Sequence, residues 1–503
     1  MPFSPPMLKD LFKEYYRELI GEEEAEQFFY TIESARMETK KAGARSIRVN
    51  TLRSSKEALR KWFESQGYEV SDVLYSKDGL ELKGSGQEWA LKLPYHSGFT
   101  YPQDSASMFA VEVLNPQEGD HVLDLTAAPG GKSTHISQRL NNTGVLVAND
   151  LDTRRIKALQ SNLSRLGITN AYVTRLTPGR LAEVYPERFD RILLDPSCSG
   201  EGLFVTREGQ PEYWNKKALK HFSGLQFGLL REAFRMLKPG GRLLYSTCTL
   251  NAIENDGVVS DFLEKTPEAQ VDDRVFDELL ARGISIPEQM GELKGIRFWP
   301  HKTHTKGFFC MALTKTAPQV FSSPAVQGGR RYRHEKKSFK KMSAHAKKPE
   351  LIVLKDKERV HYDHFLEQQF GLSSQLLREQ FEWVPLEHHL YLVTKSLAAF
   401  PPPPGFSLSL PVLKTYGKDR SDAQQDMKPS HEGAVALGLM AHKQIVVLNK
   451  EQLEASMKNQ TVSFEGLEEG MYLAVYEQKT LRFPIGLLKI GAHRTELLVP
   501  KMA

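Results

Sequence analysis

The sequence predicts an α/β fold built on a parallel β-sheet with helices on both faces, and three observations support this prediction. Five short apolar runs, starting at residues 121, 144, 171, 191 and 241, are separated by stretches of helical character. A glycine turn, "TAAPGGK", follows the first run, Asp150 follows the second, and Asp195, Cys198 and Cys248 follow the fourth and fifth. Strands that alternate with helices are typical of parallel sheets, which bind ligands at the carboxyl ends of their strands.

Composition indicates a globular chain with several domains. Its 503 residues include 67 Lys and Arg against 62 Asp and Glu, and a net charge of +5 alone does not indicate a nucleic-acid partner. Three cysteines are too few and too widely spaced for a disulfide framework, so we expect a cytoplasmic protein. The first residues do not resemble a signal peptide, and no apolar stretch reaches the ~20 residues of a membrane span.

The segment before the sheet is predicted to form a small α+β unit. Residues 1 to about 45 have the pattern of amphipathic helices, and "SIRVNTLR" from residue 46 reads as a strand. The helix "SSKEALRKWFESQG" begins at serine and ends at Gly67, and the strand "YEVSDVLY" follows. We therefore place a first unit at 1–98 and the domain with the parallel sheet at 99–316.

The second half of the chain begins with a basic segment. Residues 330–348 contain nine Lys or Arg and one Glu, with Tyr332 and Phe339 between them, inside an expected linker at 317–350. Such a run either holds phosphates or is a solvated tether, and the sequence leaves both open. Beyond it we expect an α+β segment at 351–400, the stiff spacer "FPPPPGF", and a β-rich module at 405–503.

The glycine turn and the next strand end predict a nucleoside cofactor. Gly130 and Gly131 let a ligand approach the backbone, and the start of the following helix favours an electron-rich group. The turn matches neither common phosphate-binding pattern, so a nucleoside triphosphate or a dinucleotide is not indicated. Asp150 ends the next strand, where a carboxylate either caps a helix or binds ribose hydroxyls, and the glycine turn favours ribose.

Two of the three cysteines occupy positions where chemistry is expected. Asp195 and Cys198 follow the fourth strand and Cys248 follows the fifth. If those strands are neighbours, about 5 Å apart, both thiols and the carboxylate share one pocket mouth with the glycine turn. A lone cysteine is usually a small hydrophobe, and we interpret Cys310 in "GFFCMAL" as a residue of a strand core. No spacing fits a familiar metal site, so we expect no metal.

At this point several motifs resemble one known family. "AAPGGK", "DPSCSGEG" and "YSTCTLNAIEN", with "YPQDSAS" upstream and "WPHKTHTKGFF" downstream, are similar to the motifs of S-adenosylmethionine-dependent RNA cytosine-5 methyltransferases of the NOL1/NOP2/Sun type. The resemblance covers at least residues 95–315. With its long C-terminal part the chain looks most like the bacterial branch that modifies 16S ribosomal RNA. The resemblance implies a Rossmann-like methyltransferase domain, an RRM-like N-terminal unit and a PUA-like C-terminal module.

The resemblance also implies roles for individual residues. Cys248 would bond to carbon 6 of cytosine, Cys198 would assist release of the product, Asp195 would hydrogen-bond the pyrimidine, and Lys132 would act electrostatically on a thiol and on the ligands. The implied cofactor is S-adenosylmethionine, and the implied partner is RNA. Within this class the resemblance favours ribosomal RNA or the small ribosomal subunit. The residues expected to bind the cofactor are Thr126, Ala127, Ala128, Pro129, Gly130, Gly131, Lys132, Asp150, Arg155 and Asp195.

Two departures from the family pattern keep alternatives open. The family usually has Asp-Ala-Pro-Cys where this chain has Pro196 and Ser197 between Asp195 and Cys198, and it usually has Asp-Gly where this chain has Pro178 before glycine. The alternatives are a tRNA cytosine-5 methyltransferase and an RNA-binding ribosome assembly factor with impaired catalysis. A third alternative is an amino methyltransferase. Such enzymes have an Asp-Pro-Pro-aromatic turn, and this chain has Cys198 where the aromatic residue would be.

Overall fold

The structure is a computed structural model. It describes residues 8–37, 45–84, 88–206, 209, 211–318, 350–415, 427–457, 462, 464, 466–478, 481–491 and 495–498. The basic segment at 330–348, with Tyr332 and Phe339, lies outside the described residues.

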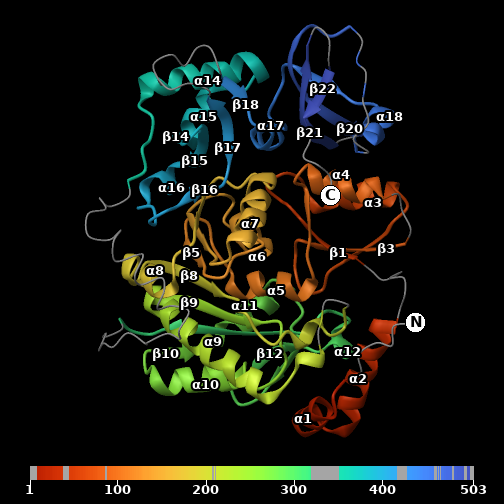
Figure 1. Cartoon of the computed structure of the whole chain (residues 1–503), viewed down its shortest axis with the longest axis vertical. Coiled ribbons are helices and arrows are strands. Elements are labelled where there is room, and N and C mark those ends of the chain that lie inside the picture. Colours follow the sequence, from red (N-terminus) through yellow and green to blue (C-terminus); the bar gives the residue numbers. More distant parts are fainter. Residues whose placement is uncertain are drawn as a thin grey trace.

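A ten-stranded sheet forms the centre of the molecule (Figure 1). Its middle five strands are all parallel, in the order β9-β8-β5-β6-β7. Their bounds are β5 His121–Asp124, β6 Val145–Asn149, β7 Ala171–Thr174, β8 Phe189–Leu194 and β9 Leu237–Thr247. The predicted parallel sheet is therefore confirmed, and its strand order reverses between β5 and β8, the point at which such sheets bind ligands.

Antiparallel strands extend this sheet at both edges. They are β10 Ala269–Val271, β11 Glu288–Met290, β12 Gly295–Phe298 and β13 Phe308–Lys315 beyond β9, and β16 Ser407–Leu408 beyond β7. The sequence predicted the parallel strands but not these antiparallel edges, because a fully buried strand shows the same apolar run in either direction. Cys310 lies in β13 and is fully buried, which confirms it as a core residue.

Two apolar cores cover the two faces of the sheet. On one face lie α5 Ser105–Leu114, α6 Gly131–Arg139, α7 Thr153–Arg165 and α11 Arg274–Ala281. On the other lie α8 Pro178–Val184, α9 Lys216–Met236 and α10 Asp256–Lys265. This arrangement confirms the predicted helices on both faces.

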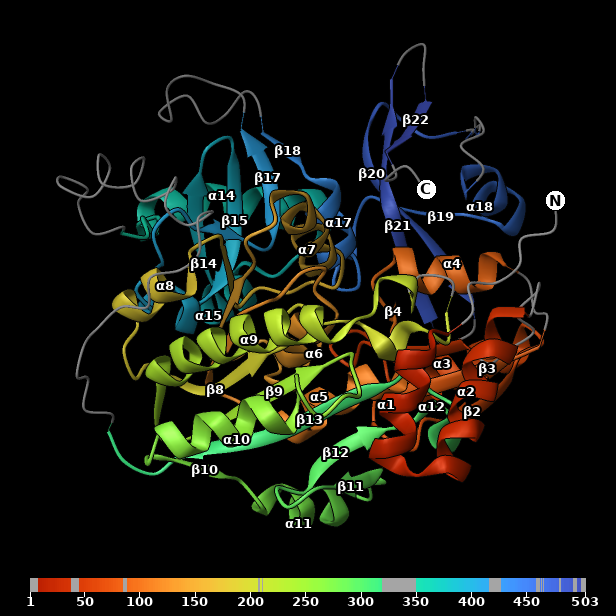
Figure 2. The same ribbon diagram turned by 60° about the horizontal axis from the view of Figure 1, so that its bottom comes forward.

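The N-terminal part combines a helical pair with a small sheet. The pair consists of α1 Asp10–Ile20 and α2 Glu22–Met37, which lie beside the short helix α12 Pro300–Thr303 (Figure 2). The antiparallel sheet has the order β2-β3-β1-β4, with bounds Glu69–Asp72, Gly79–Lys83, Arg45–Val49 and Thr100–Pro102. Its helices are α3 Lys56–Ser65, which Ser55 caps as predicted, and α4 Trp89–His96.

Two further four-stranded sheets follow in the C-terminal part. One has the order β14-β15-β17-β18, with bounds Phe381–Leu386, His389–Thr394, Pro411–Thr415 and Met427–Pro429. The other has the order β19-β20-β21-β22, with bounds Ile445–Val447, Gly470–Gln478, Leu481–Ile490 and Thr495–Leu498. The accompanying helices are α14 Asp356–Phe370, α15 Ser374–Gln380, α16 Lys395–Ala399, α17 His431–Leu437 and α18 Lys450–Met457.

The first and last sheets share one apolar core. The ring centroids of Trp62 in α3 and Phe483 in β21 lie 4.8 Å apart, and those of Phe99 and Phe483 lie 4.9 Å apart. The first and last of the four sheets therefore pack against each other beside the central sheet, as the orange and blue segments of Figure 1 show.

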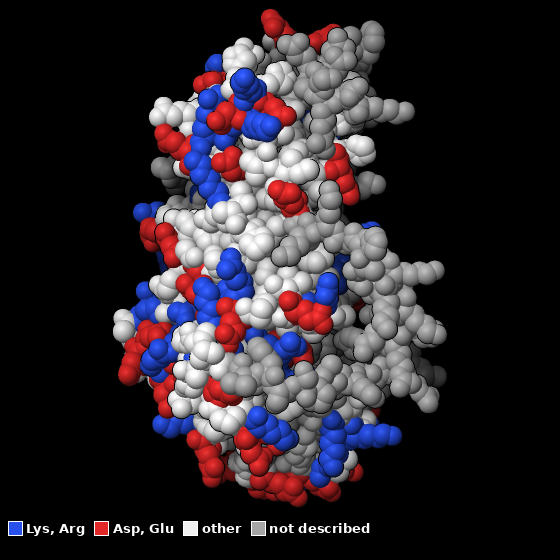
Figure 3. All heavy atoms as spheres, turned by 90° about the vertical axis from the view of Figure 1, so that its left-hand side faces the viewer, with Lys and Arg blue, Asp and Glu red and all other residues white. Residues whose placement is uncertain are grey.

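Charge is spread over the surface without a dominant sign on the face seen in Figure 3, where basic and acidic side chains alternate among the described residues. This agrees with the nearly balanced composition. Within the described part of the chain, no helix has the length and apolar character needed to cross a membrane.

Candidate active site

The two strand-end cysteines meet at the carboxyl edge of the sheet. Strands β8 and β9 are neighbours, and the Sγ atoms of Cys198 and Cys248 lie 3.1 Å apart. Both thiols are partly exposed, whereas Cys310 is fully buried. The strand order and this distance show that the two thiols lie together, as expected from neighbouring strands.

Asp195 lies beside the thiols and is held from three sides. Its Oδ2 accepts a hydrogen bond from Lys132 Nζ at 2.6 Å, and its Oδ1 accepts one from Ser246 Oγ at 3.2 Å. Its backbone nitrogen donates to Thr126 Oγ1 at 3.0 Å. Because Ser246 is two residues before Cys248, the carboxylate is tied to both the glycine turn and the strand that carries Cys248.

The charges of this group are set by burial and by neighbours. Burial alone would lower the pKa of Lys132, but the adjacent Asp195 carboxylate outweighs it and holds that pKa above its usual range. The hydrogen bond to Cys248, followed by burial, raises the pKa of the Cys198 thiol well above its usual range. Lys132 is therefore cationic at neutral pH, and Cys198 is a neutral thiol that can donate its proton.

The glycine turn places an unsatisfied carboxylate oxygen at the same edge. Asp124 ends β5, and its Oδ2 accepts a hydrogen bond from Ser133 Oγ at 2.6 Å, while its Oδ1 is buried without a hydrogen-bond partner among the described residues. Burial raises the pKa of Asp124 to about 7. A buried acceptor without a partner costs free energy, so this oxygen points to a ligand group that donates a hydrogen bond.

Gly130 and Gly131 shape the turn. Gly130 has a φ of +106°, a conformation that side chains rarely adopt, and a Cβ on Gly131 would approach the ring of Tyr101 to 3.2 Å. Arg48 of β1 fixes the start of α6 from outside, because its guanidinium donates to Gly131 O at 2.5 Å and to Thr134 Oγ1 at 2.7 Å.

Asp150 follows β6 and faces the same turn. Its Oδ2 accepts a hydrogen bond from the backbone nitrogen of Ala128 at 3.1 Å, and its Oδ1 accepts one from Asp152 N at 2.9 Å. Arg155 lies 3.6 Å from Asp150 and donates to the carbonyl oxygen of Ala128. The predicted cofactor residues are therefore brought together around the carboxyl ends of β5 and β6.

Comparisons with known proteins agree with this geometry. The family model for the 16S rRNA methyltransferase RsmB/F matches residues 111–314. A ribosomal RNA small subunit methyltransferase F from Pectobacterium carotovorum is 33% identical over 337 residues, which cover 66% of this chain and 68% of that one. The chain belongs to the RsmB/F family. It is therefore an RNA methyltransferase of the S-adenosylmethionine-dependent type. Among the other curated relatives, one from Shewanella denitrificans is 30% identical over 78% of this chain and 73% of its own length, whereas two others match over 56% and 61% of their own length.

Solved structures support the fold of this RsmB/F family member. A methyltransferase homologue from Pyrococcus horikoshii is 29% identical with a TM-score of 0.53, over 62% of this chain and all of that one. NSun6 from the same organism, solved with SFG, has a TM-score of 0.51 at 24% identity, over 62% of this chain and 98% of that one. The Rossmann-like methyltransferase fold implied by the sequence is thus confirmed.

Buried acids that the sequence analysis missed support the two cysteine turns of the RsmB/F site. Glu254 is fully buried, accepts hydrogen bonds from Ser199 N at 3.1 Å and from Gln226 Nε2 at 2.8 Å, and so joins the two turns. Burial raises its pKa. Glu201 is also buried. Both acids lie inside the quoted motifs, "SGEG" and "NAIEN". They could have been identified in the sequence as carboxylates close to a cysteine among small residues.

The altered turn before Cys198 does not separate the thiols. The carbonyl oxygen of Ser197 accepts a hydrogen bond from Gln226 Nε2 at 3.1 Å, and Cys198 still reaches Cys248. At the other departure, Thr177 precedes α8 and Pro178 is its first residue. Thr177 and Pro178 therefore start a helix where the family usually presents a carboxylate.

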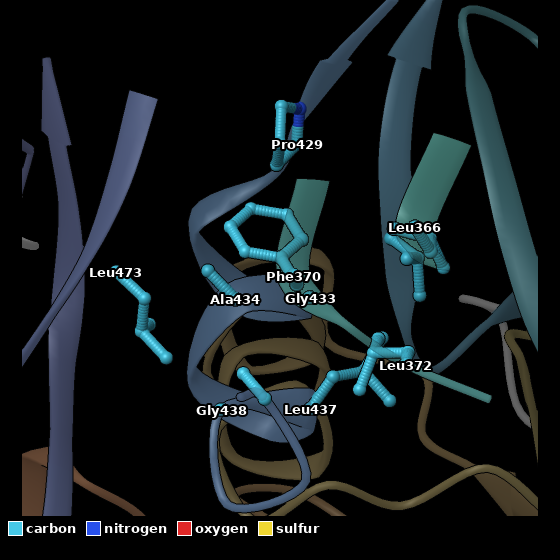
Figure 4. Close-up of a pocket in the computed structure, with 11 residues that line it drawn as sticks. Leu366, Phe370, Leu372, Pro429, Gly433, Ala434, Leu437, Gly438 and Leu473 are labelled. Carbon is cyan, nitrogen blue, oxygen red and sulfur yellow. The ribbon is translucent and has the colours of Figure 1, made fainter. Parts of the chain in front are cut away.

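Other candidate sites have a structural explanation. Asp78, Glu112 and His135 bring ligand atoms within 4.8 Å of one another, but Glu112 already pairs with Arg139 at 2.7 Å and Arg282 at 3.0 Å, so cationic side chains occupy this cluster. An apolar cavity between α14, α17 and β20 has a free volume of about 10 Å³ (Figure 4). It is too small for a ligand and lies outside the cysteine site.

Proposed function

We propose that this protein methylates carbon 5 of cytosine in 16S ribosomal RNA through a covalent bond between Cys248 and the base. The observation that carries the proposal is the 3.1 Å contact of the Cys198 and Cys248 sulfurs beside the Asp195–Lys132 pair. An amino methyltransferase needs no thiol, and here two thiols converge on one carboxylate.

The residues at the carboxyl ends of β5 and β6 fit S-adenosylmethionine. The unsatisfied Oδ1 of Asp124 can accept a hydrogen bond from an ammonium group, and Asp150 can accept hydrogen bonds from ribose hydroxyls. The glycine turn 126–131 offers backbone close to the ligand. When bound, the cofactor supplies the methyl group.

Cys248 acts as the nucleophile in this proposal. Its thiolate sulfur bonds to carbon 6 of cytosine, and the electron pair of the 5,6 double bond makes carbon 5 nucleophilic enough to be methylated. The proton of carbon 5 then passes to solvent water, the electron pair of its bond re-forms the 5,6 double bond, and the carbon–sulfur bond breaks with its electron pair returning to Cys248. The neutral thiol of Cys198 donates a hydrogen bond to that departing sulfur.

Asp195 and Lys132 hold the base during these steps. The Asp195 carboxylate accepts a hydrogen bond from the pyrimidine amino group, and Lys132 fixes the orientation of that carboxylate through the 2.6 Å contact. The target cytosine must leave its stack to reach the strand ends, so the proposed substrate is an unpaired or flipped nucleotide.

The remaining parts of the chain are proposed to bind RNA. We assign residues 1–98 to a helical and RRM-like unit, 99–316 to the methyltransferase domain, 317–350 to a basic linker, 351–400 to an intermediate segment and 405–503 to a PUA-like module. The relatives are named ribosomal RNA small subunit methyltransferases, and these names support ribosomal RNA as the substrate. The proposed location is the cytoplasm.

An RNA with 5-fluorocytosine at the target tests the mechanism, because fluorine cannot leave as a proton and the adduct is trapped. With S-adenosylmethionine present, we expect a covalent protein–RNA complex on a denaturing gel for the native protein and none for Cys248→Ala. With ordinary cytosine, Cys198→Ala should accumulate the complex that the native protein resolves.

Either of two results contradicts the proposal. One is a complex that persists in Cys248→Ala, which would assign the nucleophile elsewhere. The other is that the native protein forms no complex with either 16S RNA or assembled small subunits. If it forms a complex with tRNA alone, the substrate is tRNA.

A further inference from the structure

The turn that follows Cys248 is held by one buried carboxylate. Glu201 Oε2 accepts hydrogen bonds from Thr249 Oγ1 at 2.5 Å and from the backbone nitrogens of Leu250 and Asn251, both at 2.9 Å. The next residue, Gly202, donates its backbone hydrogen to Cys248 O at 2.9 Å. The two cysteine turns are therefore locked together at the residues that immediately follow the proposed nucleophile.

The N-terminal helix α1 reaches this same carboxylate. The hydroxyl of Tyr16 donates to Glu201 Oε2 at 2.5 Å although the two residues are 185 positions apart in the chain. The hydroxyl of the adjacent Tyr15 accepts a hydrogen bond from Ala252 N at 3.0 Å. Two consecutive tyrosines of α1 thus reach the turn 249–252, Tyr15 directly and Tyr16 through Glu201.

An apolar cluster fixes α1 in this place. Phe12 and Tyr16 are fully buried and pack with Phe28 of α2 and with Trp214 and Trp299 of the methyltransferase domain. Trp214 Nε1 also donates to Glu201 Oε1. The helical pair is thus packed beside the turn, next to α12 in Figure 2.

We propose that α1 is part of the active-site framework: Tyr16, acting through Glu201, positions the turn after Cys248 and so directs its sulfur toward the base. Tyr16 touches neither the cofactor nor the base, and it is a positioning residue. The inference rests on the proposed function, because it assigns to Tyr16 a role in the step that Cys248 performs.

Tyr16→Phe tests this role, since it removes one hydroxyl and keeps the ring in its cluster. At saturating RNA and cofactor, we expect the rate of adduct formation on 5-fluorocytosine RNA to fall on the order of tenfold, in line with what small misplacements of a reacting group cost. The KM for RNA and the affinity for S-adenosylmethionine should stay unchanged.

Tyr172→Phe is the matched control. Tyr172 is equally buried, and its hydroxyl donates to Leu397 O at 3.0 Å, far from the cysteine turns in the chain. A general loss of stability would slow both variants, whereas the proposal requires that only Tyr16→Phe is slow. Equal rates for Tyr16→Phe and the native protein, or equal slowing of both variants, would overturn it.

Glu201→Gln tests whether Tyr16 works through this carboxylate. If it does, the double variant Tyr16→Phe/Glu201→Gln reacts no more slowly than Glu201→Gln alone, and multiplied effects would contradict the proposed path. Failure of the native protein to form any adduct would instead refute the proposed function, so the two failures are distinguishable.

Discussion

At the scale of single residues, Asp124 makes stability depend on pH. Burial raises its pKa to about 7, whereas an unfolded aspartate titrates near ~3.9. Between these values the folded protein keeps a proton that the unfolded chain has lost. The stability contributed by Asp124 is thus fully present below about pH 4 and is lost as the pH rises through about 7.

Asp124→Asn should remove this dependence, because the amide oxygen can still accept the hydrogen bond from Ser133. Relative to the native protein, the variant should gain free energy of unfolding as pH rises from 5 to 7, with a slope of at most ~1.4 kcal/mol per pH unit. Urea unfolding at pH 5, 6 and 7 measures this difference, and a constant difference would show that Asp124 does not titrate in this range.

Patterns in the sequence predicted the reactive residues of the site, but not the residues that hold them in place. Cys198, Cys248 and Asp195 were predictable because each follows an apolar run, and strand ends meet at one edge of a parallel sheet. Tyr16 was not predictable, because its partner is 185 residues away and no local pattern connects them. Glu201 was visible only as one letter of a motif.

At the scale of elements, helix α8 begins at the carboxyl edge of the sheet, where we expect the cofactor to bind. Pro178 is the first residue of this helix, and Thr177 before it makes no capping hydrogen bond through its side chain. Relatives of this type usually place a carboxylate here, so we expect this chain to recognise the adenine part of its cofactor weakly.

Pro178→Asp should raise the affinity for S-adenosylmethionine by about three- to tenfold, the contribution of one hydrogen bond of 0.5–1.5 kcal/mol. A negative charge in the first turn of a helix is also compatible with its dipole. Calorimetric titration of S-adenosylmethionine into the native protein, Pro178→Asp and Pro178→Ala separates the effect of adding the carboxylate from the effect of losing the proline ring. Equal affinities in all three would refute the expectation.

The periodic elements of the central sheet followed from the sequence, and the edges did not. The runs at β5 to β9 alternate with helices, which fixes a parallel arrangement. Strands β12 and β13 are antiparallel, and nothing in a buried apolar run reveals its direction. The pairing of β16 with β7 brings in residues 407 and 408, which the sequence placed beside a spacer.

At the scale of the whole molecule, the shared core of the first and last sheets couples their stabilities. Trp62→Ala should lower the free energy of unfolding by about 3–5 kcal/mol, and Phe483→Ala should do so similarly. Because the rings are in contact, the double variant should lose less than the sum of both changes.

Chemical denaturation of the single and double variants measures this coupling. Trp299→Ala with Phe483→Ala is the control pair, since Trp299 belongs to the separate cluster under α1 and its effect should add to that of Phe483. Additivity of Trp62 and Phe483 would mean that the two sheets fold independently. This contact could not be predicted from the sequence. The pattern of α3 or of β21 shows an apolar face but does not show which element packs against it.

The contact between α1 and the cysteine turns also has a consequence for synthesis on the ribosome. Phe12 and Tyr16 emerge first, but Trp214 and Trp299, against which they pack, emerge much later. At about 5–20 residues per second, the helical pair waits on the order of tens of seconds with its apolar side uncovered. The hydrogen bonds from Tyr15 and Tyr16 to the region of the cysteine turns can therefore form only after those later residues have been synthesised.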